Sequence, residues 1–434
     1  MNVIRILIIA LLLPVAVHAS DAEKLTLQEC IDIALENNSE LKLTEYSKNG
    51  ARAKMNESLT HFFPRLTSSA SYLRLESAPT AELPDGTVYP VAGKETYEYS
   101  VSLTQPIFTG GRIKNGYSIS KYEFESAKEE KSIKQKDVIT EVTKNYFQVL
   151  KAKKFEEISI SSRNLIESHL KNVEAFYEAG IVSKNDLLSA KVSLANANNF
   201  LIKASNNYEL AKSGLNFSLN QDLNSPLNLE DIDEGAPEQN TDNEDFNYES
   251  CVEKAFDYRE ELNIINNVKK ISKSAVNLER SSYYPQFYAI ATYGETGDDL
   301  PLNDDTSSLL VTAELDIFSW GGTSYRVESS KIALKKAKES ETLLRNSIQL
   351  EVKRAYLQLK QSIEEINATK QAVEQAQENY RIFDEKFKVN AATSTDVLDA
   401  ENLILESKIN YFQALYNYHI AKIILKRATG EINL

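Results

Sequence analysis

Residues 97–112 read YEYSVSLTQPIFTGGR, and residues 309–322 read LLVTAELDIFSWGG. In each stretch, large apolar residues largely alternate with polar ones, which is the period of a β-strand with one apolar and one polar face. Such strands are typical of a membrane β-barrel, whose outer face meets lipid. Each stretch ends in two glycines, which permit a tight bend. A long segment without proline and almost without glycine then follows each glycine pair and predicts a long helix.

The likeness of these two stretches is part of an internal repeat. Residues 107–220 align with residues 317–430 without a gap, and residues 30–64 align with residues 251–285. The hairpin region of the first copy is 11 residues longer than that of the second. Each copy is therefore expected to contain a helix, a β-hairpin, a long helix, a tight turn and a further helix.

The repeat predicts the organisation of the chain. The chain divides into a signal peptide at 1–19, a first repeat at 20–220, an acidic linker at 221–250 and a second repeat at 251–434. Within the repeats we expect hairpins at 64–108 and 285–318, and tight helix–helix turns at 178–186 and 388–396. The linker contains ten Asp or Glu and no Lys or Arg, so a solvated connection is favoured over a specific binding segment.

The first residues indicate export. Arg5 precedes an apolar run that ends at Val17-His18-Ala19, a small-residue cleavage site. No later stretch reaches the roughly 18 apolar residues of a membrane helix. A soluble periplasmic protein and an outer-membrane barrel both fit these observations.

The helices after the tight turns carry a heptad pattern. Apolar residues recur there at every seventh position in both copies: Leu187, Leu194, Leu201, Tyr208 and Leu215, then Val397, Ile404, Tyr411, Tyr418 and Leu425. Five consecutive heptads indicate coiled-coil packing, and an amphipathic helix of a globular bundle is the weaker alternative.

Composition argues against several function classes. A net charge of −14 supplies no basic face for a nucleic-acid partner. Cys30 and Cys251 occupy equivalent places in the two copies, so we expect two buried free thiols and no disulfide. His61, His169 and His419 have no metal-ligand spacing, and no catalytic set is visible. We therefore expect no enzyme activity, no metal and no cofactor.

Two hairpins supply four strands, which are too few to close a barrel. Open sheet edges are not tolerated in lipid, so closure requires further copies of the chain. Oligomerisation follows from this argument, but the number of copies does not.

The chain resembles the TolC-type outer-membrane efflux protein family across essentially its whole length after the signal peptide. The motifs that carry the resemblance, present in order, are Leu25–Asn38 (LTLQECIDIALENN), Phe63–Leu66 (FPRL), Gln105–Arg112 (QPIFTGGR) and Thr395–Ala400 (TDVLDA). The resemblance implies a mainly α chain with a β-barrel segment. Three chains would form a 12-stranded outer-membrane β-barrel continued by a 12-helix periplasmic α-barrel.

The resemblance also implies a function. The chain would be a passive outer-membrane export duct of a Gram-negative bacterium, in a tripartite efflux or type I secretion system. Its partners would be two further copies of itself, outer-membrane lipid, a periplasmic adaptor protein and an inner-membrane pump of the RND, ABC or MFS class. The sequence does not identify the exported substrate, the adaptor or the pump class.

The two tight turns are the candidate adaptor-contact tips in this family. The residues are Gly180, Ile181, Val182, Ser183 and Asp186 in the first turn, and Asn390, Ala391, Ala392 and Thr393 in the second. A purely structural interpretation is also expected to hold. Gly180 and Asn390 suit left-handed helix ends, and the Ser, Thr and Asp residues suit caps of the following helix.

Asp396 and Asp399 resemble the acidic residues that line the periplasmic channel entrance of the family. They lie on nearly the same helix face, and capping accounts for Asp396 alone. Gathered in a ring, they would raise each other's pKa, favour cations and bind multivalent cations. The Tyr and Arg of the family's entrance latch align with Phe387 and Ala392, so the latch is not carried over.

Two alternatives remain open at this point. One is a periplasmic coiled-coil scaffold protein without a pore, and the other is a barrel with enzymatic activity of its own.

Overall fold

The computed structural model describes residues 24–231, 247–302 and 304–432. The predicted signal peptide and residues 232–246 of the predicted linker lie outside the described residues. Among the helices within these ranges, none is long and apolar enough to cross a membrane.

The chain forms two compact units, and each unit takes segments from both copies of the repeat. The hairpin unit comprises described residues within 24–37, 141–231 and 362–420. The sheet unit comprises those within 38–140, 247–361 and 421–432. A copy of the repeat is therefore not a separate compact body.

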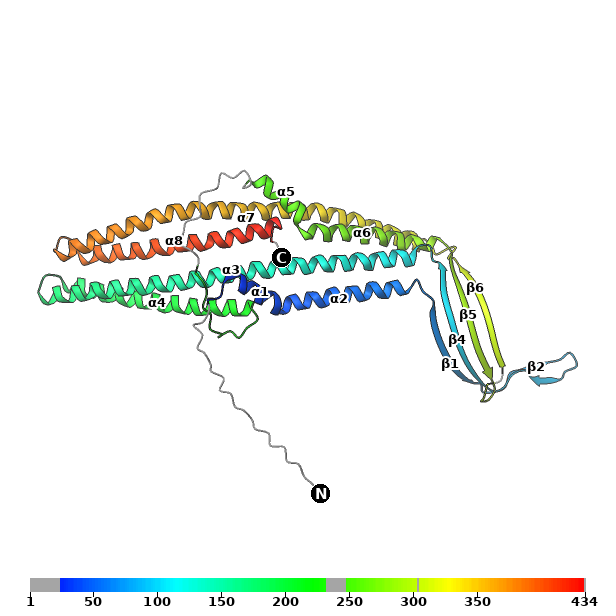
Figure 1. The fold of residues 1–434 in the computed structure, drawn as a ribbon. Helices are drawn as coiled ribbons and strands as arrows, with labels where there is room; N and C mark the ends of the chain where they lie inside the picture. Colours follow the sequence, from blue (N-terminus) through cyan, green and yellow to red (C-terminus); the bar gives the residue numbers. More distant parts are fainter. Residues whose placement is uncertain (1–23, 232–246, 303, 433–434) are drawn as a thin grey trace, which may run out of the picture. The chain divides into compact units, whose positions relative to one another are not determined.

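The sheet unit combines helices with a four-stranded antiparallel sheet (Figure 1). Its strands are β1 (Arg65–Arg74), β4 (Glu95–Phe108), β5 (Gln286–Gly297) and β6 (Asp304–Glu314). Its helices are α2 (Ser39–Thr60), α5 (Tyr248–Tyr258), α6 (Glu260–Arg280), the short 3-10 helix η3 (Ser281–Tyr283), and parts of α3 (Arg112–Glu178), α7 (Gly322–Lys388) and α8 (Ser394–Thr429).

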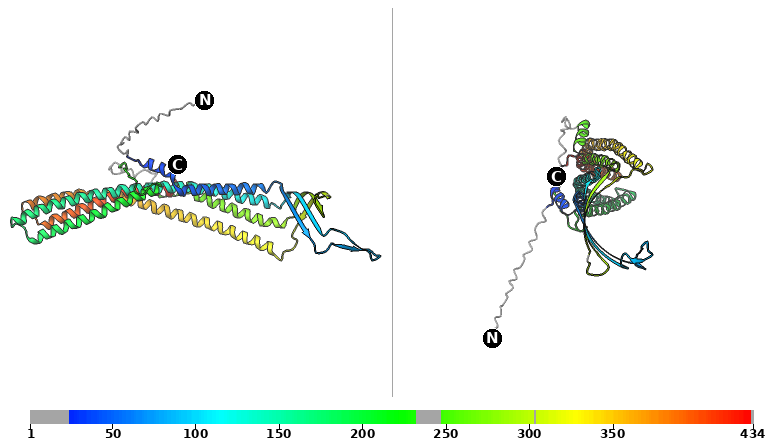
Figure 2. Two further views of the ribbon diagram at one scale, coloured as in Figure 1. Left: turned by 90° about the horizontal axis from the view of Figure 1, so that it is seen from below. Right: turned by 90° about the vertical axis from the view of Figure 1, so that its right-hand side faces the viewer.

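The sheet has the order β1-β4-β5-β6, so β4 and β5 join the two repeats. The four strands curve together (Figure 2). Leu66 lies opposite Leu103, and Leu103 lies opposite Ala291, so apolar residues share one face. Ser102 lies on the other face, where its hydroxyl is 3.1 Å from that of Thr292. The predicted separation into an apolar and a polar face is present in the register.

The two edge strands are exposed along most of their length. All ten residues of β1 are exposed, and so are ten of the eleven residues of β6. Within the described part of the chain, each edge strand pairs with one neighbour only. The unpaired backbone of an edge is free to bind a further strand.

The first hairpin contains an element that the sequence did not predict. Strands β2 (Thr80–Glu82) and β3 (Val88–Pro90) form a separate two-stranded hairpin within the segment 64–108 that was predicted as a single hairpin. Its turn is closed by Gly86, whose amide donates to the carbonyl of Leu83 at 2.9 Å, and Gly86 has φ +84°. The strands are only three residues long, so alternation gave no usable signal.

Ion pairs connect the helices of the sheet unit. The Arg259 guanidinium, 6% exposed, donates to both carboxylate oxygens of Glu261 at 2.9 Å and to the carbonyl of Ala428 at 3.1 Å. Arg427 pairs with Asp137 at 2.6 Å and with Glu261 at 3.2 Å. These bonds tie the start of α6 to α3 and to the end of α8.

The hairpin unit is helical. It contains α1 (Leu27–Asn37), α4 (Lys184–Ser218), the later part of α3, the later part of α7 and most of α8. None of the ten heptad residues that the sequence singled out is exposed. The stripe they form is therefore the packing face of α4 and α8, as knobs-into-holes packing requires.

The described start of the predicted linker is docked on the hairpin unit. Leu229 is 6% exposed and forms a parallel bridge with Leu25. The Tyr146 hydroxyl donates to the carbonyl of Glu230 at 2.6 Å. This part of the acidic segment is thus ordered by backbone contacts.

Candidate functional site

The first tight turn joins α3 to α4. Gly180 has φ +73°, and the Ile181 amide donates to the carbonyl of Phe176 at 2.8 Å, which closes the end of α3. Ser183 then caps α4. Its hydroxyl accepts from the Asp186 amide at 3.2 Å, while the Asp186 carboxylate accepts from the Ser183 amide at 3.0 Å. This reciprocal capping box fixes the turn at both ends.

The second turn, between α7 and α8, repeats this design. Asn390 has φ +55°, and the Ala391 amide donates to the carbonyl of Lys386 at 2.8 Å. Thr393 caps α8, with its hydroxyl accepting from the Asp396 amide at 3.2 Å and its own amide donating to the Asp396 carboxylate at 2.8 Å. The expected left-handed helix ends and caps are therefore confirmed in both turns.

The structure brings the two turns together. One shallow pocket of about 390 Å³ is lined from both sides, and its polar walls include Asp186 and Asp396. The remaining lining residues are Ile181, Val182, Ser183, Phe387, Asn390, Ala391, Ala392, Thr393 and Ser394. All nine predicted tip residues except Gly180 thus line the same pocket.

The pocket rests on an apolar core. Phe387, 2% exposed, packs with Leu170, Val173, Ala190 and Val397. Its ring centroid also lies 4.8 Å from that of His169. The side chain that occupies the family's latch position is therefore a core residue that joins the two helical hairpins.

His169 is one of the polar groups buried beneath the turns. Its Nε2 lies 2.8 Å from the hydroxyl of Ser394, the first residue of α8. Burial lowers the pKa of His169, so the neutral imidazole is favoured at neutral pH. His169 is therefore a packing residue of the hairpin unit.

Asp396 and Asp399 differ in environment. Hydrogen bonds from the Thr393 hydroxyl and amide hold the pKa of Asp396 below its ordinary value. Within the single chain, capping stabilises the Asp396 carboxylate; the rise expected for a ring formed by several copies stays a prediction. Asp399 is exposed on α8 and does not line the pocket.

A buried carboxyl group in the same unit was missed by the sequence analysis. Glu401 on α8 is 2% exposed, and burial raises its pKa to about 7. The Ser162 hydroxyl on α3 and the Lys408 ammonium favour the ionised form, but they do not offset burial. Glu401 lies four residues after Val397 and three before Ile404, at the second core position of the heptad, so the spacing indicates a buried position that its charged residue type concealed.

The cysteines lie elsewhere. Cys30 on α1 and Cys251 on α5 are both free and buried. Burial raises the pKa of Cys30 to about 11 and also raises that of Cys251, so both thiols stay protonated. Across the residues the structure describes, no three His, Cys, Asp or Glu gather as metal ligands would.

Comparison with known proteins gives consistent matches. A family model described as "Outer membrane efflux protein" matches residues 30–221 and 270–431. The outer membrane protein TolC of Vibrio cholerae is 21% identical over 306 residues, which cover 69% of this chain and 69% of TolC. The alkaline protease secretion protein AprF of Pseudomonas aeruginosa is 27% identical over 190 residues, which cover 43% of this chain and 37% of AprF.

The solved structures extend the likeness to the fold. The outer membrane protein VceC of Vibrio cholerae has a TM-score of 0.81 at 16% identity, over 93% of this chain and 96% of VceC.

Proposed function

This chain belongs to the outer membrane efflux protein family, and from that premise we propose that it is the outer-membrane duct of a tripartite export machine. The duct would be passive, with energy supplied by an inner-membrane pump of the RND, ABC or MFS class. A periplasmic adaptor would connect the two. The relative TolC is an outer membrane protein, and the relative AprF is an alkaline protease secretion protein. The proposal therefore includes both efflux and type I secretion. The relatives give no support to a periplasmic scaffold without a pore.

The open sheet supports closure by further copies of the chain, and the family resemblance implies that there are three. Strands β1 and β6 carry exposed edges, and pairing β6 of one copy with β1 of the next would satisfy both edges. Three four-stranded sheets would then give a 12-stranded barrel. With the polar face inward, Ser102 and Thr292 would line an aqueous lumen while Leu66 and Leu103 would meet lipid.

The pair of capped turns is the main support for contact with an adaptor. Each turn is fixed by a capping box, and each exposes one large apolar side chain, Ile181 at 48% and Val389 at 74%. A rigid turn loses little conformational entropy on binding, and an exposed apolar residue supplies contact area. The turns would therefore be the periplasmic tips that contact the adaptor.

Site-specific photo-crosslinking tests the tips. A photoreactive amino acid at Ile181 or Val389 should capture the adaptor in intact cells. The same amino acid at Leu210, which is 71% exposed on α4 outside the turns, is the matched control and should not capture it. Adaptor capture from Leu210 alone would place the contact elsewhere.

Acidic residues near the tips would form the channel entrance. Asp396 lines the pocket between the turns together with Asp186, and exposed Asp399 follows one helical turn later. In a trimer, Asp396 and Asp399 would provide six carboxylates around one opening. Such a ring would favour cations and bind trivalent metal ions.

Planar-bilayer conductance tests the entrance. The parent should be cation-selective and blocked by hexaamminecobalt(III) added on the periplasmic side. Asp396→Asn with Asp399→Asn should weaken both effects without disturbing trimer assembly, because an Asn side-chain oxygen can still accept from the Thr393 amide. Unchanged selectivity and block in the double variant would mean that Asp396 has only its capping role and that the entrance lies elsewhere.

A further inference from the structure

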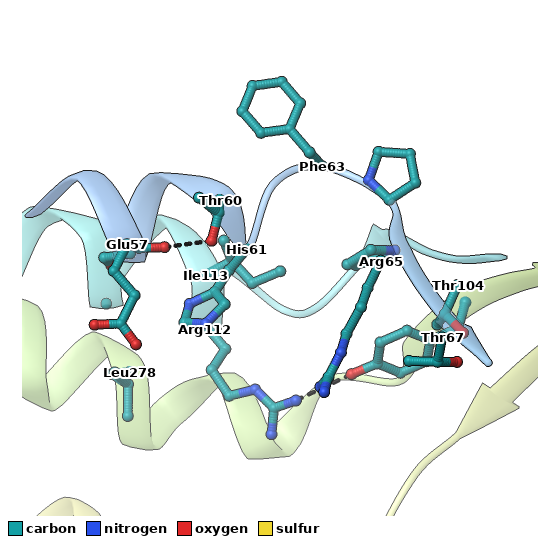
Figure 3. A pocket seen from close by; sticks show the side chains of 15 residues that line it. Glu57, Thr60, His61, Phe63, Arg65, Thr67, Thr104, Arg112, Ile113 and Leu278 are labelled. Atoms are coloured by element: carbon teal, nitrogen blue, oxygen red, sulfur yellow. Dashed lines mark hydrogen bonds between the residues drawn. The ribbon is translucent and has the colours of Figure 1, made fainter. Parts of the chain in front are cut away.

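A pocket in the sheet unit, outside the tips, collects basic side chains. It lies where α2 ends, β1 begins and α3 starts, and its volume is about 930 Å³. Arg65 on β1 and Arg112 on α3 both extend into it, and His61 lies beside them (Figure 3). Glu57 is the one carboxylate among the residues that line it. The lining therefore carries two guanidinium groups against a single carboxylate.

The two arginines are not used in ion pairs. Among the described residues, neither Arg65 nor Arg112 forms a salt bridge with a carboxylate. Arg112 instead donates to the Tyr288 hydroxyl at 3.0 Å, and Tyr288 donates to Gln286 at 2.8 Å. This chain of hydrogen bonds orients the Arg112 guanidinium, while its other N–H groups remain available to an acceptor.

The fold does not require these charges. By the repeat alignment, Arg65 corresponds to Gln286 and Arg112 to Gly322. Gln286 begins β5 as Arg65 begins β1, and Gly322 begins α7 as Arg112 begins α3. In the second copy the strand therefore begins with a neutral glutamine and the helix begins with a glycine. Because the same elements form without the two arginines, the arginines are not needed for the backbone geometry.

The pocket opens on the polar face of the sheet. Arg65 lies opposite Thr104, and Tyr288 lies opposite Pro106, two residues further along β4 on the same face. This is the face of Ser102 and Thr292, which the proposed function assigns to the lumen. An occupant of the pocket would therefore be a solute in the duct and not the headgroup of a surrounding lipid.

We propose that Arg65 and Arg112, with His61 beside them, form a binding site for phosphate-type anions on the luminal face of the barrel base. Paired guanidinium groups match the geometry of phosphate oxygens and bind them by charge-assisted hydrogen bonds. Three copies of the chain would place three such sites around the duct, one per subunit. The luminal position of this site depends on the proposed function as an export duct.

Block of channel current by inorganic tripolyphosphate tests the site. The full-length protein is inserted in phosphatidylcholine bilayers at low ionic strength, where charge interactions are least screened. The parent should be blocked in a concentration-dependent way. Arg65→Gln with Arg112→Gln should keep the open-channel conductance within about twofold and raise the half-blocking concentration at least tenfold. Arg65→Lys with Arg112→Lys keeps both charges but loses the planar guanidinium fork, so it should raise the half-blocking concentration by less than the glutamine pair does.

A matched control lies on the same strand. Arg74 at the far end of β1 pairs with Glu95 at 3.5 Å, and Arg74→Gln should leave the block unchanged. A conducting parent without block, or a block that survives in the glutamine pair, would overturn the anion site and leave the export duct standing. Absence of any channel current would instead overturn the duct itself.

A reciprocal variant covers the case in which the glutamine pair does not insert. A side chain fits at Gly322, where an added Cβ would lie 3.6 Å from Arg326 and 3.8 Å from Ser319. Gly322→Arg leaves Gln286 in place as the acceptor of Tyr288, adds a basic side chain at the equivalent helix start of the second copy, and should lower the half-blocking concentration at least threefold. No change in this variant, with normal conductance, would count against the proposal.

Discussion

Replacing the buried Glu401 by Gln should make the protein more stable at alkaline pH. Glu401 lies on α8 within the hairpin unit, 2% exposed, and burial raises its pKa to about 7 from a model-compound value of 4.5. Glutamine has nearly the same shape but cannot ionise. The substitution therefore removes the cost of burying a negative charge and retains the packing.

The magnitude follows from proton linkage. Between pH 4.5 and 7, the folded chain binds a proton at Glu401 that the unfolded chain has released, so stability falls as the pH rises. The contribution is fully present below pH 4.5 and fully lost above pH 7. At about 1.4 kcal/mol for each pH unit, the loss amounts to about 3 kcal/mol per chain. The Gln variant should show no such loss.

Guanidinium unfolding of the protein in detergent, followed by helical circular dichroism, measures the effect. The free energy of unfolding of Glu401→Gln minus that of the parent should grow by about 3 kcal/mol between pH 4 and pH 8. Any constant cost of the buried amide cancels in this comparison. Glu406→Gln, an exposed position on the same helix, is the control and should give a difference independent of pH.

The reasoning has a clear point of failure. If the difference between Glu401→Gln and the parent is the same at pH 4 and pH 8, the carboxyl group is not held neutral by burial. The Ser162 hydroxyl and Lys408 would then stabilise the ionised form more than the structure indicates.

Three further predictions concern the tips and the thiols. Phe387→Ala should lower the free energy of unfolding by about 3–5 kcal/mol because it opens a cavity beneath both turns, and guanidinium unfolding with Phe387→Leu as the milder control would measure it. Thr393→Ala should cost about 1 kcal/mol by removing the cap of α8, whereas Thr393→Ser should cost little; equal losses would argue against capping. A non-reducing peptide map should show Cys30 and Cys251 unlinked, and a joined peptide would contradict the burial of both as free thiols.

The elements of each repeat could be predicted from local signals, and the fold class that the family resemblance implied is confirmed by the likeness to the solved outer membrane protein VceC. Alternation over residues 97–104 fixed which residues share a face of β4, because side chains of a strand alternate whatever the neighbours are. Positive φ at Gly180 and Asn390 followed from residue type in the same way. Each of these features depends on a few residues close in sequence.

Features that depend on distant segments could not be predicted. The raised pKa of Glu401 requires α3 to pack on α8, and the sequence gives no measure of that contact. The lowered pKa of Asp396 in the single chain reflects its hydrogen bonds with Thr393, whereas like-charge effects in a ring depend on further copies of the chain. The basic pocket needs Arg65 and Arg112 to meet Tyr288, which is 176 residues from Arg112 along the chain. Motif matching identified both arginines without revealing their shared surroundings.

The two buried cysteines also allow the opening of each compact unit to be measured by thiol labelling. Cys30 belongs to the hairpin unit and Cys251 to the sheet unit, so each compact unit contains one native thiol that reacts only when the unit opens. Labelling with N-ethylmaleimide over time, followed by peptide mass spectrometry, would give two opening rates from one unmodified sample. Equal rates would mean that the units open as one, whereas unequal rates would rank their local stability without any engineered label.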